Sequence, residues 1–115
     1  MAKRPIPHEI TDAWLHPLLT QRTIRRDLLK YLRNFHRKEL LAAAERLRSF
    51  ERPTLILWAK EDRVMPPAHG RRLAALLPRA RLVEIPDSYT LLPEDQPAKL
   101  AAYIRAFIAE DASAA

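Results

Sequence analysis

The chain has 115 residues, no cysteine, a formal net charge of +6, and 48% hydrophobic against 30% charged residues. This balance is typical of a globular chain rather than a disordered one, and the lack of cysteine excludes disulfides, thiolate metal ligands and a cysteine nucleophile. No apolar run approaches the ~18 residues of a membrane span, and none follows the basic start of the chain as in a signal peptide. We therefore expect a cytoplasmic protein.

The positive charge is concentrated in the first half of the chain. Residues 1–52 contain 12 Lys and Arg against 6 Asp and Glu, whereas residues 53–115 contain 8 of each. A basic segment of this kind indicates either a solvated helical face or contact with nucleic acid. No known nucleic-acid-binding pattern accompanies it, so the solvated face is favoured and a nucleic-acid binder is the weaker alternative.

Residues 1–52 read as an irregular entry segment followed by two helices. Residues 1–19 contain three prolines and show no sustained period. Apolar residues then recur at helical spacing, which predicts a helix over 20–35: Ile24, Leu28, Tyr31, Leu32 and Phe35. A second helix is predicted over 38–48, and Pro53 ends the helical pattern.

Residues 53–115 alternate between strand and helix patterns. The continuous apolar run 54–58 predicts a strand buried on both faces, and a helix follows over 67–77. A second strand is predicted over 81–85, a loop over 86–96, and a last helix from Pro97 onwards. This order predicts an α/β fold, two helices followed by β-α-β-α with a two-stranded parallel sheet. A strand as apolar as 54–58 normally has neighbours on both edges, so the small sheet suggests that part of a larger one is missing.

Candidate functional residues follow the two predicted strands, because parallel strands present their exit loops at one edge of the sheet. The first loop carries Glu61 and Asp62, and the second carries Asp87, Ser88, Tyr89 and Thr90. If these residues have no functional role, we expect Asp62 to cap the turn that follows it, Ser88 to make a turn hydrogen bond, and Glu61 to be solvated.

Four motifs in this half, taken in order, resemble the C-terminal portion of the α/β-hydrolase fold family. They are PTLILWAKEDRVMP (53–66), HGRRLAALLP (69–78), ARLVEIPDS (80–88) and PEDQP (93–97). The first resembles the family pattern P-x-L-I-x-W-G-x-x-D-x-x-x-P, whose Asp is the acid of the catalytic triad. The resemblance implies that Asp62 holds this acid position. Residues 1–52 resemble, more loosely, the end of the family's helical cap or lid.

The departures from the family pattern concern its catalytic machinery. The loop after the last strand normally reads D-S-G-H and supplies the catalytic His, but here it reads Asp87-Ser88-Tyr89-Thr90. A Thr hydroxyl cannot serve as a base near neutral pH. Gly70 is the only glycine, so the nucleophile elbow G-x-S-x-G is absent. The four histidines, His8, His16, His36 and His69, lack the spacing of metal ligands, and we expect neither a metal nor a cofactor.

These observations lead to three hypotheses. The first is a C-terminal fragment of an α/β-hydrolase that is inactive alone, from a parent acting on a small ester, epoxide, haloalkane or similar bond. The second is an interaction module whose exposed strand edge at 54–58 pairs with a separate N-terminal half or with a second copy of the chain. The third is the basic nucleic-acid binder. No membrane partner is expected.

Overall fold

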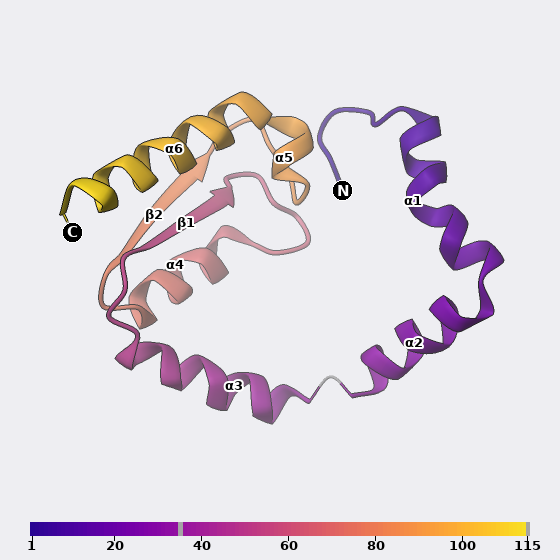
Figure 1. Ribbon diagram of the computed structural model, residues 1–115, viewed down its shortest axis with the longest axis horizontal. Helices are drawn as coiled ribbons and strands as arrows, with labels where there is room; N and C mark the ends of the chain where they lie inside the picture. The colour runs from indigo at the N-terminus through magenta and orange to yellow at the C-terminus, as the bar shows by residue number, and fades with distance from the viewer. Residues whose placement is uncertain (35, 115) are drawn as a thin grey trace. The chain divides into compact units, whose positions relative to one another are not determined.

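The computed structural model describes residues 1–34 and 36–114. The chain divides into two compact units, one formed by Met1–Arg4 with Ala44–Ala115 and the other by Pro5–Ala43. Figure 1 shows the elements in chain order. Phe35, the last apolar residue of the predicted helix 20–35, lies outside the described residues.

The larger unit is built on a two-stranded parallel sheet. Strand β1 (Thr54–Ala59) pairs with β2 (Ala80–Ile85) along their whole length, from Thr54 opposite Ala80 to Ala59 opposite Ile85. The predicted strands and their parallel pairing are therefore confirmed, each strand being one residue longer than expected. Both strands end at the same edge of the sheet (Figure 1).

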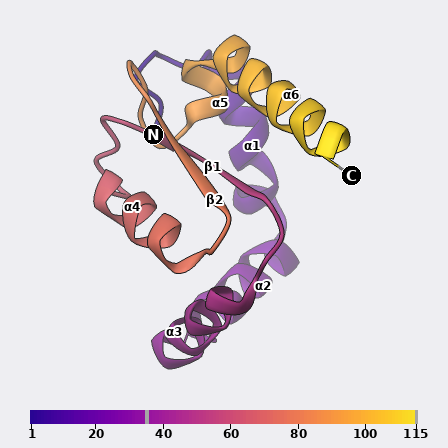
Figure 2. The same ribbon diagram turned by 90° about the vertical axis from the view of Figure 1, so that its left-hand side faces the viewer.

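Helices cover both faces of this sheet, which explains why successive positions of β1 are apolar. Figure 2 shows α4 (Pro67–Leu76) and α6 (Pro97–Ala114) on opposite sides of the two strands. On the α6 side, a buried cluster joins the strand ends to the short helix α5 (Leu92–Asp95), and it comprises Ala59, Ile85 and Leu92, with Leu57, Val83 and Leu100 packed against them.

On the opposite face, α4 approaches β1 very closely at Gly70. A Cβ atom built on Gly70 would lie 2.8 Å from the Cδ2 atom of Trp58. The indole is fixed from its other end, because Trp58 Nε1 donates a hydrogen bond of 2.9 Å to the backbone oxygen of Met65. Only a glycine allows this contact between the helix and the ring.

The helical segment before β1 differs from the prediction. It contains α1 (His8–Thr20), α2 (Arg22–Arg33), α3 (Arg37–Arg46) and a 3-10 turn (Leu47–Ser49). The irregular segment predicted over 1–19 is therefore wrong for its larger part, and three α-helices replace the two expected.

Two of the three prolines near the start do not disrupt the first helix, because they precede it. Pro5 lies before α1 and Pro7 is its N-cap residue, while only Pro17 lies inside the helix. A proline in a helix removes one backbone donor, and α1 continues for only three residues beyond Pro17. Gln21 then closes the helix by donating its N–H to the Pro17 oxygen at 2.9 Å.

The predicted loop 86–96 also contains a helical turn, α5. None of the helices in the described part of the chain combines the length and apolar character that a membrane crossing requires.

We predict that Gly70→Ala lowers the stability of the larger unit. Alanine improves helix propensity by about 1 kcal/mol, but overpacking against the Trp58 indole costs about 1–3 kcal/mol. Thermal unfolding followed by circular dichroism should therefore show a lower Tm. In a Trp58→Leu background the same substitution should raise the Tm, since the ring is gone. A higher Tm for Gly70→Ala in the wild-type background would contradict the packing argument.

Candidate functional site

The polar residues singled out by the sequence gather where β1 and β2 end. The loop 60–66 leaves β1 and the loop 86–91 leaves β2, and the Lys60 N–H donates to the Ile85 oxygen at 2.9 Å where the strands finish. The in-register parallel pairing thus brings the two loops to one edge of the sheet. This edge is where α/β folds place their functional residues.

Asp62 and Thr90, one from each loop, are in direct contact. The Thr90 hydroxyl donates to Asp62 Oδ1 at 2.7 Å. The same oxygen accepts the backbone N–H groups of Val64 and Met65, both at 2.9 Å, so Asp62 also caps its own turn as predicted. The two residues that match the acid and base positions of the family pattern are therefore adjacent in the structure.

The carboxyl of Asp62 is held in its charged form. Burial opposes ionisation, but the N–H of Met65, the Thr90 hydroxyl and the N–H of Val64 outweigh it and keep the pKa of Asp62 below its ordinary value. All three donors stabilise the carboxylate because they donate to it. A fixed, charged carboxylate can orient a base that is hydrogen-bonded to it. The partner of Asp62 here is the Thr90 hydroxyl, which has no basic nitrogen.

Glu61 and Asp87 form a second bridge between the loops. The Asp87 N–H donates to Glu61 Oε1 at 3.0 Å, and Gln96 Nε2 donates to the Asp87 backbone oxygen at 2.9 Å. Asp87 adopts a φ of 58°, a left-handed conformation in which Asp is enriched among non-glycine residues. Glu61 is exposed, as the sequence predicted, but it also accepts a hydrogen bond that anchors this turn.

A fourth carboxylate, Asp95 at the end of α5, is fully buried, with an exposed fraction of 0%. Its oxygens accept the backbone N–H groups of Lys3, Arg4 and Tyr89 at 2.8 to 3.0 Å. Burial raises its pKa, but these three donors and the charge of Arg4 outweigh burial and hold the pKa of Asp95 below its ordinary value. Sequence reasoning missed this residue, because its partners Lys3 and Arg4 lie at the other end of the chain.

The remaining candidate residues are Ser88 and the histidines. Ser88 is fully buried and its hydroxyl donates to the Ile85 oxygen at 2.7 Å, which is the predicted turn hydrogen bond. His69 lies in the first turn of α4, and His8 and His16 lie in α1. Within residues 1–34 and 36–114, no group of three or more His, Asp or Glu side chains is arranged to hold a metal ion.

Parallel strands flanked by helices on both faces, with paired polar loops at their carboxyl edge, define an α/β fold. The family described as alpha/beta hydrolase fold matches residues 9–97. This chain belongs to that family.

Several known proteins resemble the chain over much of its length. An uncharacterized hydrolase of Bacillus subtilis (strain 168), YugF, is 31% identical over 106 residues, which make up 92% of this chain and 37% of the relative. The crystal structure of MGS-MChE2, an alpha/beta hydrolase from the metagenome of lagoon sediments at Mar Chica, Morocco, superposes with a TM-score of 0.67 at 25% identity, over 90% of this chain and 46% of that one.

A thermophilic esterase from Thermogutta terrifontis gives a TM-score of 0.57 at 29% identity, covering 59% of this chain and 25% of the esterase. The chain thus spans less than half the length of each of these three proteins.

We predict that Thr90→Val raises the pKa of Asp62 towards its ordinary value, because the substitution removes a donor to the charged carboxylate. It should also cost about 1 kcal/mol of stability through the lost hydrogen bond. Carbon-detected NMR titration of the Asp62 carboxyl measures the first effect. Thr90→Ser keeps the hydroxyl and should titrate like the wild type. An identical titration of Asp62 in the Val and Ser variants would contradict the contact.

Proposed function

We propose that this chain forms the C-terminal part of an α/β-hydrolase domain in which Asp62 occupies the position of the triad acid. The observation that carries the proposal is the 2.7 Å hydrogen bond from Thr90 to Asp62. It joins the two positions at which the family pattern has its acid and its base. Asp62 also follows a β-strand at the carboxyl edge of a parallel sheet, where such an acid belongs.

We further propose that the chain by itself does not catalyse ester hydrolysis. Thr90 replaces the imidazole that would accept a proton from the nucleophile, and none of the 115 residues form G-x-S-x-G. Loss of one triad member costs on the order of 10⁴-fold in rate, and the activity that survives such losses comes from the oxyanion hole and substrate binding. The nucleophile elbow that would contribute to such a hole is missing as well.

The substrate of the whole domain belongs to the same proposal. A small ester is the first candidate, since one structural relative is an esterase. An epoxide or a haloalkane remains an alternative, because the nucleophile and the substrate pocket that would distinguish them do not lie in these 115 residues.

A second role, pairing with another chain, is supported by the strand edges. Among the described residues the sheet contains β1 and β2 alone. Thr54 and Lys60 direct their N–H groups to the β2 side, to the oxygens of Arg79 and Ile85. Because N–H groups alternate in direction along a strand, Leu55 directs its own away from β2. An unpaired edge of this kind can add a strand from another chain.

We predict that the purified chain hydrolyses p-nitrophenyl acetate no faster than buffer. Asp62→Asn should leave this rate unchanged, because the acid has no base to orient. Thr90→His should leave it unchanged as well, since an added imidazole does not supply the missing nucleophile elbow. Turnover well above buffer that disappears in Asp62→Asn would refute the proposed inactivity.

For the pairing role, we expect light scattering after size-exclusion chromatography to show a dimer that increases with concentration. Leu55→Pro removes an N–H that does not take part in the β1–β2 ladder, and proline is tolerated at such edge positions. This variant should remain folded by circular dichroism and be monomeric. A wild-type chain that stays monomeric at every concentration would count against self-pairing.

A further inference from the structure

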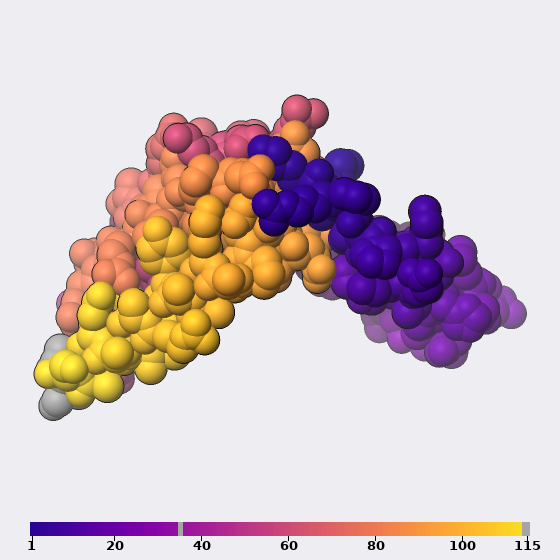
Figure 3. Space-filling view, turned by 90° about the horizontal axis from the view of Figure 1, so that it is seen from above, coloured from indigo at the N-terminus to yellow at the C-terminus, as the bar shows by residue number. Residues whose placement is uncertain are grey.

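The first four residues of the chain belong to the same compact unit as the strand-end loops. Met1–Arg4 is grouped with Ala44–Ala115, and we call it the N-terminal strap. Figure 3 shows the start of the chain, in indigo, against the orange segment that follows β2. The Leu91 N–H donates to the Met1 oxygen at 3.0 Å, so the strap lies beside the loop that carries Thr90.

The strap is held first through its backbone. Asp95 Oδ1 accepts the N–H groups of Lys3 at 2.8 Å and of Arg4 at 3.0 Å, while Oδ2 accepts the Tyr89 N–H at 2.8 Å. One buried carboxylate therefore binds two successive N–H groups of the strap and one of the loop. These contacts require an extended segment but not particular side chains.

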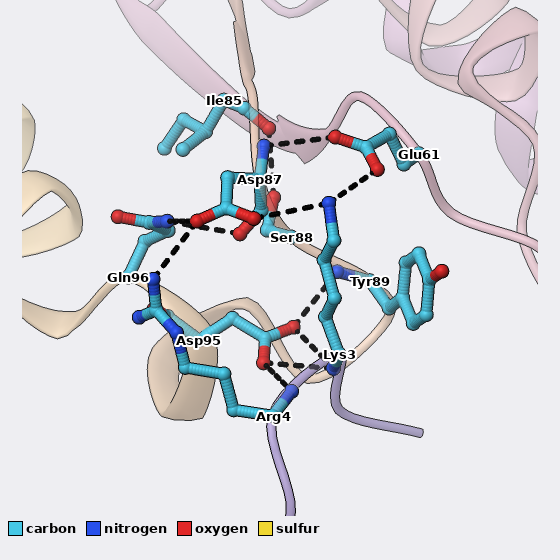
Figure 4. A network of polar contacts seen from close by, with 9 residues as sticks. All are labelled: Lys3, Arg4, Glu61, Ile85, Asp87, Ser88, Tyr89, Asp95 and Gln96. Carbon is cyan, nitrogen blue, oxygen red and sulfur yellow. Dashed lines mark hydrogen bonds and ion pairs between the residues drawn. The ribbon is translucent and has the colours of Figure 1, made fainter.

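The side chains of the strap add a requirement for positive charge. The Lys3 ammonium lies 2.5 Å from Glu61 Oε2 and 3.0 Å from Asp87 Oδ1, and 5.7 Å from the centre of the Tyr89 ring. The Arg4 guanidinium donates to Asp87 Oδ2 at 2.8 Å and to the backbone oxygen of Asp95. Figure 4 shows both side chains directed into this network.

We propose that Glu61, Asp87 and Asp95 form a docking site for an extended segment with two successive basic residues, and that the strap is its intramolecular occupant. Asp95 binds the backbone of the segment, while Asp87 and Glu61 select its charge. The same chemistry would accept a basic segment of another chain whenever the strap is displaced. The inference does not depend on the proposed hydrolase role.

Leaving this site empty is costly. Without the strap, Asp95 would retain only the Tyr89 N–H of its three backbone donors. A buried carboxylate that loses its donors is strongly disfavoured, and Asp87 and Glu61 would lose the ammonium that lies between them. Exchange of one basic segment for another is therefore favoured over an open site.

The test uses the full chain with the strap reversed in charge, Lys3→Glu with Arg4→Glu, and the peptide acetyl-MAKRPI-amide as the probe. The matched control is Arg26→Glu with Lys30→Glu, the same charge change in α2. Isothermal titration calorimetry should show binding to the strap variant at least about tenfold tighter than to wild type or control, because a docked strap leaves few sites free. Binding should weaken as salt is added, and acetyl-MAEEPI-amide should not bind.

Amide exchange by NMR gives a second readout that does not require the peptide. In the wild type, the N–H groups of Tyr89 and Leu91 should be protected, and protection should fall in the strap variant and return when the peptide is added. The milder pair Lys3→Gln with Arg4→Gln serves if charge reversal prevents folding. Equal peptide affinity for wild type and strap variant, no binding to either, or an unprotected Leu91 amide in the wild type would each overturn the proposal.

Discussion

The in-register parallel pairing of β1 with β2 is the constraint on which the other features depend. Because Ala59 lies opposite Ile85, the loops that follow the two strands begin side by side. Two hydrogen bonds then join these loops directly: Thr90 to Asp62, and Asp87 to Glu61. A shift of the register would separate both pairs. The register of the two strands thus determines which loop residues can contact one another at this edge.

Much of the larger unit could be predicted from the sequence because its signals are local. A continuous apolar run predicted β1 correctly, since helices on both faces demand apolar side chains at successive positions. Prolines marked several of the boundaries. Near the start, however, prolines led to a wrong prediction of irregular structure. Pro5 and Pro7 precede α1, and Pro17 lies so near the end of α1 that few residues remain to be disrupted. A count of prolines therefore says less than their positions.

The site was only partly predictable. Asp62, Thr90 and Ser88 could be found because each lies in a motif of contiguous residues. The partnership of Asp95 with Lys3 could not, since 92 positions separate the two residues and neither belongs to a periodic pattern. The exposure of Glu61 was predicted correctly, but its contacts were not. Its partners Lys3 and Asp87 become neighbours only through the tertiary fold.

The three helices before β1 share a feature with a thermodynamic consequence: no described side chain in α1, α2 or α3 is buried. A compact unit without a buried side chain gains little from the hydrophobic effect, so its unfolding absorbs little heat and has a small heat-capacity change. The unit built on β1 and β2 does have a core. Heating should consequently melt the two units over different temperature ranges, and a single free energy of unfolding would not describe the chain.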